Sequence, residues 1–283
     1  MKRAAGTQGA FTLVEAITAC GVVGVVGLIV FTVLNIGMTL YAQNVSLNQT
    51  HAGGLFSTET LLAKVAAAAE EPVLVDDAGA TVSGNGPAAG VRFFSPVSSS
   101  PYGIPFAVSA TATSFTVTRT VGQPVPAAGD KITMSDLGFE GVITSVSGAA
   151  GSYTVGFAST VGSGFSPAQT TGTVIPAASK CFVLKPSAFI SVNSSLRYYP
   201  RAMSVAQDGA PTFNAAGSFS PIAKLLPVGA ATNCFPFQYL TSNRRAIDVN
   251  LRVRSAAHGG RIGGFYTFQN VKTTVAYRSD VNQ

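Results

Sequence analysis

Few residues in this chain have the types and spacing that enzyme chemistry requires. The two histidines, His51 and His258, lie far apart in the sequence, and His258 falls in a Gly-rich turn. No segment has the pattern of a nucleophile elbow, a zinc-protease helix, a phosphate-binding loop or a dinucleotide-binding turn. We therefore expect a protein that is not an enzyme, and a membrane-anchored extracytoplasmic enzyme is the less favoured alternative.

Metal ligands are sparse as well. Asp76 and Asp77 are adjacent, and Asp130 and Asp136 lie in another part of the chain, so no calcium loop of the usual spacing is present. No CxxC pair or His/Cys cluster suggests zinc. We predict no cofactor and no metal site, although a single calcium ion held by loop carboxylates stays open.

The three cysteines allow one redox prediction. Cys20 lies in an apolar segment, where a cysteine acts as a small packing residue. Cys181 and Cys234 lie in the distal part of the chain and could form a disulfide in an oxidising compartment. Such a bridge would contribute about 4 kcal/mol in the loop-entropy account. The alternative is two buried free thiols.

Charge argues against nucleic acid as a partner. The chain has 18 Lys and Arg against 12 Asp and Glu, and charged residues are only 11% of the total. The net charge of +6 is too dilute for a nucleic-acid footprint. One local basic cluster comprises Arg244, Arg245, Arg252 and Arg254. We interpret it as a solvated strand face, with a partner or phosphate contact as the alternative.

The element that dominates the sequence is an apolar N-terminal segment. A basic leader, MKRAAGTQGA, precedes the run FTLVEAITACGVVGVVGLIVFTVLNIGMTLY, and no charge occurs between Ala16 and Tyr41. About 20 apolar residues suffice for a helix to span a bilayer. Lys2 and Arg3 precede the run and no basic residue follows before Lys64, which predicts a cytoplasmic N-terminus and an extracytoplasmic remainder.

The junction between the leader and the apolar run carries a specific resemblance. The string Gly9-Ala10-Phe11-Thr12-Leu13-Val14-Glu15 resembles the prepilin peptidase site of type IV pilins and type II secretion pseudopilins. That family has Gly before the cut, Phe after it and Glu five residues into the mature chain, whereas this chain has Ala10 before Phe11. The resemblance implies cleavage before Phe11 and N-methylation of that residue. Cleavage after Gly9 is the alternative.

The same resemblance implies a role for Glu15. A carboxylate in hydrocarbon is costly unless it is paired or reaches the interface. In this family the acid pairs with the N-terminal amine of a neighbouring subunit during filament assembly, and we expect that role for Glu15. The alternative is an interfacial side chain that only extends toward the headgroups.

The helix is predicted to continue beyond the membrane. Leu47, His51, Leu55 and Val65 belong to an apparent amphipathic stripe, and Pro72 is expected to end the helix. The other members of the stripe are Thr58, Leu62 and Ala69. We expect His51 to be an ordinary helix-surface residue.

The rest of the chain has the short alternating segments and turns of an antiparallel sheet. The predicted fold is α+β: a long N-terminal helix followed by a β-rich, pilin-like head. The predicted segments are a leader at 1–10, the membrane-spanning half of the helix at 11–41, its amphipathic half at 42–71, and a head at 72–283 with an inserted β-subdomain at 113–160.

These observations lead to one functional prediction and one alternative. The resemblance implies a large minor (J- or W-like) pilin or pseudopilin, a structural subunit of a type IV pilus, type II secretion or DNA-uptake filament. Its partners would be other pilin subunits, the prepilin peptidase and the inner-membrane assembly platform. It would reside in the inner membrane as a single-pass protein before it enters a filament or reaches the cell surface. The alternative is an adhesin-like tip subunit that binds through the inserted subdomain.

Overall fold

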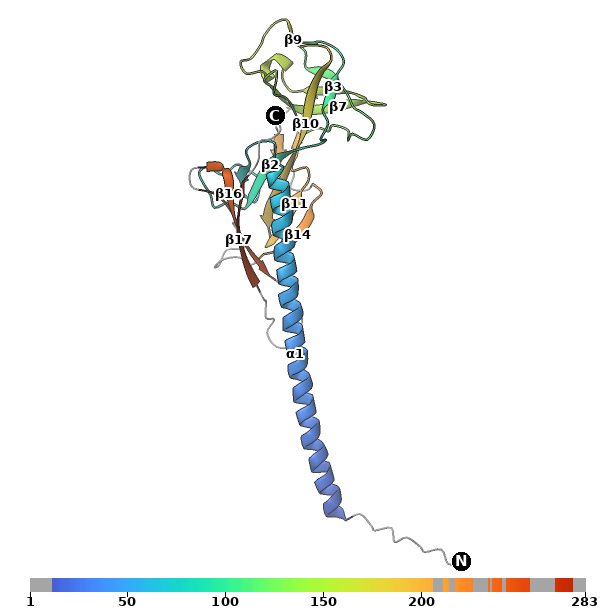
Figure 1. Cartoon of the computed structure of the whole chain (residues 1–283), viewed down its shortest axis with the longest axis vertical. Coiled ribbons are helices and arrows are strands. Elements are labelled where there is room, and N and C mark those ends of the chain that lie inside the picture. The colour runs from blue at the N-terminus through green and yellow to red at the C-terminus, as the bar shows by residue number, and fades with distance from the viewer. Residues whose placement is uncertain are drawn as a thin grey trace, which may run out of the picture.

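A computed structural model describes residues 12–205, 211–213, 217–225, 234, 236–240, 243–254 and 268–276. One long helix, α1 (Leu13–Ala66), is followed by antiparallel strands that form a two-lobed head (Figure 1). The lobe beside the helix end is called the lower lobe, and the lobe farthest from the N-terminus is called the barrel. The predicted α+β class, with a long apolar helix and a β-rich antiparallel domain, is confirmed.

Local sequence explains where α1 begins and ends. Thr12 caps its first turn, and its 54 residues correspond to about 80 Å of helix. The helix ends at Ala66 rather than at the predicted 71. The reason is a tertiary contact: the N–H of Ala69 donates to the carbonyl of Phe94, 2.7 Å away, so the chain joins a strand before Pro72 is reached.

The face of α1 that packs against the head differs from the predicted stripe. Leu47 and Leu55 are 42% and 64% exposed, and of that stripe only Val65 is fully buried. The buried residues of α1 are Ser46, Thr50, Gly54, Ser57, Leu61 and Val65. Small side chains on this face let a strand approach the helix closely, which an apolar pattern does not reveal.

The lower lobe consists of two sheets around the end of α1. The first has the order β1 (Val73–Val75), β2 (Gly90–Pro96), β10 (Ser179–Val192), β11 (Ser195–Tyr199) and β14 (Ser220–Lys224). The second has the order β15 (Phe237–Leu240), β16 (Asn243–Arg254) and β17 (Phe268–Ala276). All of these pairs are antiparallel.

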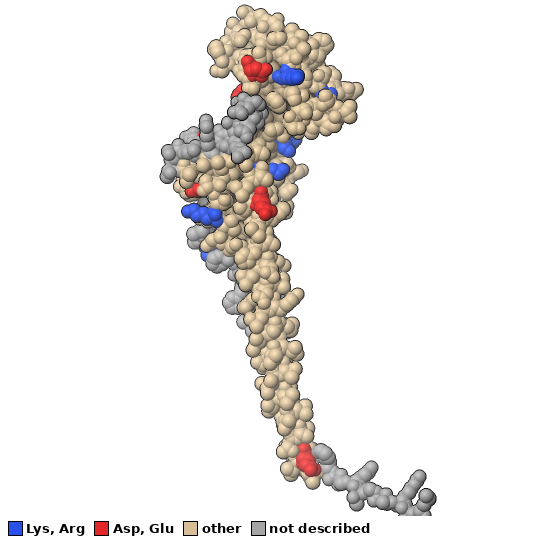
Figure 2. Space-filling model, in the orientation of Figure 1, with Lys and Arg blue, Asp and Glu red and all other residues tan. Residues whose placement is uncertain are grey.

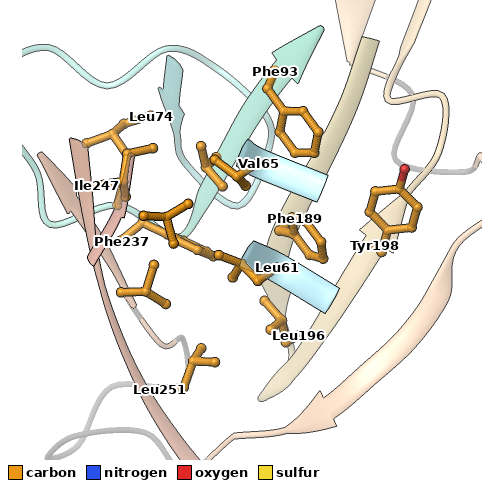
Figure 3. Packing of buried hydrophobic residues seen from close by; sticks show 14 of the residues in the cluster. Leu61, Val65, Leu74, Phe93, Phe189, Leu196, Tyr198, Phe237, Ile247 and Leu251 are labelled. Carbon is orange, nitrogen blue, oxygen red and sulfur yellow. The ribbon is translucent and has the colours of Figure 1, made fainter. Parts of the chain in front are cut away.

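The core of the lower lobe forms where the last turns of α1 meet both sheets. Leu61 and Val65 lie between Phe93 and Phe189 of the first sheet and Leu251 of the second (Figure 3). The Phe93 and Phe189 rings stack with centroids 5.9 Å apart. Burial of large apolar side chains at about 1.5–3 kcal/mol each holds the helix end in this lobe.

The second lobe is a closed barrel of six strands. Their order is β10, β3 (Tyr102–Ile104), β5 (Ser114–Thr118), β8 (Ser152–Phe157), β7 (Phe139–Ala149) and β6 (Lys131–Met134), and β6 pairs again with β10. The predicted subdomain at 113–160 holds four of these strands. Closure also requires β3 and β10, so the barrel core extends from Tyr102 to Val183.

The long strand β10 joins the two lobes. Its first residues pair with β3 and β6 in the barrel, and its later residues pair with β2 and β11 below. The barrel is therefore joined to the lower lobe by the backbone of β10 and by the hydrogen bonds that β10 forms in both lobes. It lies at the end of the molecule opposite the N-terminus (Figure 1).

The remaining described elements are short. They are the pair β4 (Val108–Ser109) and β9 (Thr173–Ile175), the pair β12 (Met203–Val205) and β13 (Pro211–Phe213), and the 3-10 turn η1 (Val161–Gly164). The short alternating segments that the sequence predicts as strands include 131–134, which forms β6, and 195–199, which forms β11.

Candidate functional site

The first turn of α1 holds the acid that the sequence singled out. Glu15 and Thr12 form a reciprocal capping box: the Thr12 N–H and Oγ1 each lie 2.9 Å from Glu15 Oε2, and the Glu15 N–H donates to Thr12 Oγ1 at 3.3 Å. This arrangement satisfies free N–H groups at the helix start. The T-x-x-E spacing is visible in the sequence, yet the sequence reasoning missed it. Gly9, Ala10 and Phe11 lie outside the described residues.

The membrane-compatible part of α1 contacts nothing else in the described chain. Every residue from Thr12 to Tyr41 is exposed, including the large apolar side chains of Val23, Phe31 and Met38. This part of α1 also carries almost no charge along its length (Figure 2). The helix is long and apolar enough to cross a bilayer.

Apolar exposure continues beyond that segment. Leu47, Leu55 and Phe56 are 42%, 64% and 56% exposed, although they belong to the part of α1 that packs on the lower lobe. They occupy the surface of α1 that does not pack on the strands. The predicted exposure of His51 on this helix is confirmed.

Charged residues cluster at the neck, defined here as Glu70, Asp130, Lys131, Lys185 and Arg201. Lys131 Nζ lies 2.7 Å from Glu70 Oε1 and 2.6 Å from Glu140 Oε2, and it lies over the Phe94 ring. Lys131 thus connects β6 and β7 of the barrel to the segment that follows α1.

A second ion pair at the neck is buried. The Asp130 carboxylate, which is 0% exposed, pairs with Arg201 of the lower lobe and accepts from the Ala127 N–H at 2.9 Å. Burial raises the pKa of Asp130 to about 6, while the charge of Arg201 opposes that rise. The sequence indicated Asp130 only as a possible calcium ligand, because its ion-pair partner Arg201 is distant in the chain.

The other acidic candidates do not converge on a cation. Asp76 Oδ1 accepts from the Ala78 and Ala80 N–H groups and so forms a turn. In the part of the chain that the structure describes, no three His, Cys, Asp or Glu residues lie close enough together to hold a metal ion.

The predicted pairing of Cys181 and Cys234 is wrong for this structure. Both are free, buried thiols, and they belong to different cores: Cys181 to the barrel and Cys234 to the lower lobe. Burial raises the pKa of Cys181 to about 12, and it also raises the pKa of Cys234. Sequence separation alone could not show that the two thiols lie in different lobes.

The basic cluster is only partly described. Arg252 and Arg254 share one face of β16, as predicted, opposite the buried Leu251 and Val253. Both are half-buried rather than fully solvated. The side chains of Arg244 and Arg245, and all of His258, lie outside the described residues.

A pocket of about 250 Å³ opens on the barrel. It lies between the first residues of β7 and the segment that runs from the end of β8 through η1. Phe157 and Glu140 line it together with Ser159, Thr160 and Ser163. No motif in the sequence indicated this pocket, because its lining comes from two separate segments, one at the start of β7 and one that begins at the end of β8.

Comparison of the chain with family models, characterised proteins and solved structures finds no match to any of them.

Proposed function

We propose that this protein is a structural subunit, a minor pilin or pseudopilin, of a type IV pilus, type II secretion or DNA-uptake filament. In this role the leader is cleaved, α1 stays in the inner membrane with the head outside, and subunits later assemble through α1. Other pilin subunits, the prepilin peptidase and the assembly platform are its partners.

The observation that carries the proposal is the unpartnered apolar surface of α1, with one acid at its first turn. An anchor would need only the membrane-spanning half. Here the apolar exposure extends to Leu55 and Phe56, beside the head, where lipid would not cover it. A helix bundle formed with neighbouring subunits would cover both parts.

Glu15 supports the same role. Its capping box satisfies hydrogen bonds but leaves the charge without a cation among the described residues. A cut before Phe11 would create an amino terminus within one turn of this carboxylate. Pairing of opposite charges in a medium of low dielectric constant would reward one register between subunits.

The test is mass spectrometry of the chain purified from cells with and without a prepilin peptidase. We expect a mature N-terminus at Phe11, carrying one methyl group, only when the peptidase is present. A leader that stays intact in both strains, or a cut near residue 40, would refute the proposal.

The barrel favours a second candidate role, that of a tip subunit that binds a ligand. It lies at the end of the molecule farthest from α1 (Figure 1), and it contains the pocket lined by Phe157 and Glu140. In a filament built from α1, such a lobe would face outward.

A further inference from the structure

The pocket on the barrel arises from a split between two strands. Residues 143–149 of β7 pair with β8, beginning with Ile143 opposite Phe157, whereas residues 139–142 pair with β6, and the register with β8 shifts between Ile143 and Ser145. After Phe157 the chain turns away from β7. The pocket lies between the diverging segments, and the backbone bridge between Phe139 and Phe165 limits the free edge of β7 at one end.

Backbone groups of β7 face this space. The Ile143 N–H donates to the Asp130 carbonyl, and the Ile143 carbonyl accepts from the Gly129 N–H, both at 2.8 Å, so the backbone groups of Ile143 point toward the segment that leads into β6. Successive peptide groups alternate in direction along a strand, so those of Val142 point toward the pocket. Those of Glu140 do the same: a Cβ on Gly164 would lie 2.5 Å from its carbonyl oxygen.

The side chains add one apolar surface and several hydrogen-bonding groups. Phe157 is half-buried and lines the pocket; Phe115 stacks on its ring with centroids 5.2 Å apart, and Phe139 meets it at 89° with centroids 5.9 Å apart. Ser163 Oγ donates to the Thr160 carbonyl at 2.6 Å and lies 3.0 Å from Ser159 Oγ, which positions the hydroxyls. Glu140 supplies a carboxylate, one oxygen of which pairs with Lys131.

Charge excludes several ligand classes. The barrel segment 102–183 holds three cations and three anions, and among the described residues no Lys or Arg lines the pocket. A phosphate, a carboxylate or a nucleic acid would meet the carboxylate of Glu140, whose partner Lys131 is shared with Glu70, so the three side chains keep a net negative charge. Ser and Thr make up 22 of the 82 residues of this segment, so most of its polar side chains are uncharged hydroxyls.

The volume of the pocket narrows the class of ligand further. A water molecule occupies about 30 Å³ of the liquid, and pockets for drug-sized ligands begin at about 300 Å³. A pocket of about 250 Å³ has room for one ring with its hydroxyl groups. A peptide strand does not fit, because the free edge of β7 covers only a few residues and Phe165 closes its end.

We propose that this pocket binds a single neutral sugar residue, such as the terminal residue of a glycan. The C–H face of the ring would lie on Phe157. Its hydroxyls would donate to Glu140 and exchange hydrogen bonds with Ser159, Thr160 and the β7 backbone. The proposal rests on the tip-binding role and is independent of the filament role.

The test is a saturation-transfer difference NMR titration of the full chain in a detergent without a sugar headgroup. The probes are D-glucose, D-galactose, D-mannose, N-acetyl-D-glucosamine and N-acetyl-D-galactosamine, with D-glucuronic acid as the anionic comparison. We expect at least one neutral sugar to bind saturably with a Kd on the order of 1 mM. D-glucuronic acid should bind at least about tenfold more weakly, because it meets the charge of Glu140.

Two variants and two matched controls locate the site. Ala158→Trp, at an exposed position of the lining, should fill the pocket and abolish binding, and Glu140→Gln should weaken it several-fold. Ala149→Trp and Asp136→Asn, on exposed positions of the barrel outside the lining, should bind as the parent chain does. All four should keep the far-UV circular dichroism of the parent chain.

Three results would overturn the proposal: no saturable binding of any neutral sugar by the parent chain, equal effects of variants and controls, or tighter binding of D-glucuronic acid. Leader cleavage of the Ala158→Trp variant should be unchanged. Failure of the sugar titration with normal cleavage would therefore refute this site alone and leave the filament role in place.

Discussion

At the scale of single residues, the sequence pattern does not separate the capping role of Glu15 from the assembly role that we propose for it. Its carboxylate caps the first turn through Thr12, and its charge is available for a partner outside the chain. Capping requires an acceptor at this position, and a glutamine also provides one. Pairing with an amine requires the negative charge. Substitutions at this one residue can therefore distinguish a local role from an intermolecular one.

We predict that Glu15→Gln and Glu15→Ala insert into the membrane normally but lose most filament incorporation, with a reduction of about tenfold or more. This loss follows because both lack the charge that pairs with a neighbouring subunit, and each factor of ten corresponds to only about 1.4 kcal/mol. The measurement is the amount of the variant in sheared filaments relative to membranes. Glu59→Gln, an exposed acid on the same helix, is the control.

If Glu15→Gln assembled normally while Glu15→Ala did not, the residue would act only as a helix cap. Normal assembly of both variants would show that Glu15 merely extends toward the interface.

At the scale of elements, α1 uses its two faces for different purposes. The face toward the head carries Ser46, Thr50, Gly54 and Ser57, while the large apolar side chains of its middle turns stay outside. Gly54 allows the closest approach: a Cβ there would lie 3.0 Å from Gln269 Oε1 and 3.2 Å from a methyl group of Val271 on β17. The packing of β17 on the helix therefore depends on a missing side chain.

We predict opposite effects for two neighbouring glycines. Gly54→Leu should lower the free energy of unfolding of the head by about 1–3 kcal/mol, because the added side chain overlaps β17. Gly53→Ala should raise it by up to about 1 kcal/mol, because its Cβ meets only Val253 at 3.7 Å and alanine favours helix. Urea unfolding of the full chain in detergent, followed by circular dichroism, measures both. Equal stabilities would contradict the described helix–strand contact.

Strand positions were largely predictable, and the reason is local. Strands β6 and β11 follow alternating apolar residues bounded by turn residues, which are properties of short segments. The buried face of α1 was not predictable, because a small residue such as Gly54 becomes buried only through contact with a distant strand, here with Gln269 and Val271 of β17. An apolar pattern indicates burial within the chain correctly only where the packing of the chain itself covers the apolar side chains. The pattern looks the same where a membrane or a neighbouring subunit would cover them.

At the scale of the whole molecule, the barrel and the lower lobe are joined at the neck. Strand β10 passes through it, and the buried Asp130–Arg201 pair connects the two lobes from the side. A folded pKa of about 6 lies above the unfolded value of about 3.9. Between these values the folded chain binds the proton more tightly than the unfolded chain. The contribution of Asp130 to stability therefore increases as pH falls from 7 toward 4, by on the order of 3 kcal/mol.

We predict that Arg201→Gln destabilises the head much more at pH 8 than at pH 5. Without Arg201 the pKa of Asp130 rises further, so at pH 8 a buried carboxylate is left without its cation, at a cost of about 3 kcal/mol or more. At pH 5 the protonated carboxyl no longer needs it, and the cost should be below about 1 kcal/mol. Urea unfolding at both pH values measures the difference.

Lys224→Gln, an exposed cation on β14, serves as the control and should show no such dependence on pH. The double variant Asp130→Asn, Arg201→Gln should also lose it. A loss of stability in Arg201→Gln that is equal at the two pH values would show that the ion pair does not connect the lobes as described.

The sequence by itself determined the properties that depend on neighbouring residues. These are a long helix that is apolar enough to span a membrane, an acid at its first turn, an α+β division of the chain, and the positions of several strands. Local dihedral preferences, hydrophobic periodicity and charge act over a few residues, so a linear reading detects them. Only the tertiary structure decided which face of α1 is buried, that β10 closes a barrel with β3 and β6, that Cys181 and Cys234 lie in separate cores, and that a pocket opens beside Phe157. Each of these features depends on contacts between residues far apart in the chain. Such contacts contribute to stability only once the strands have paired.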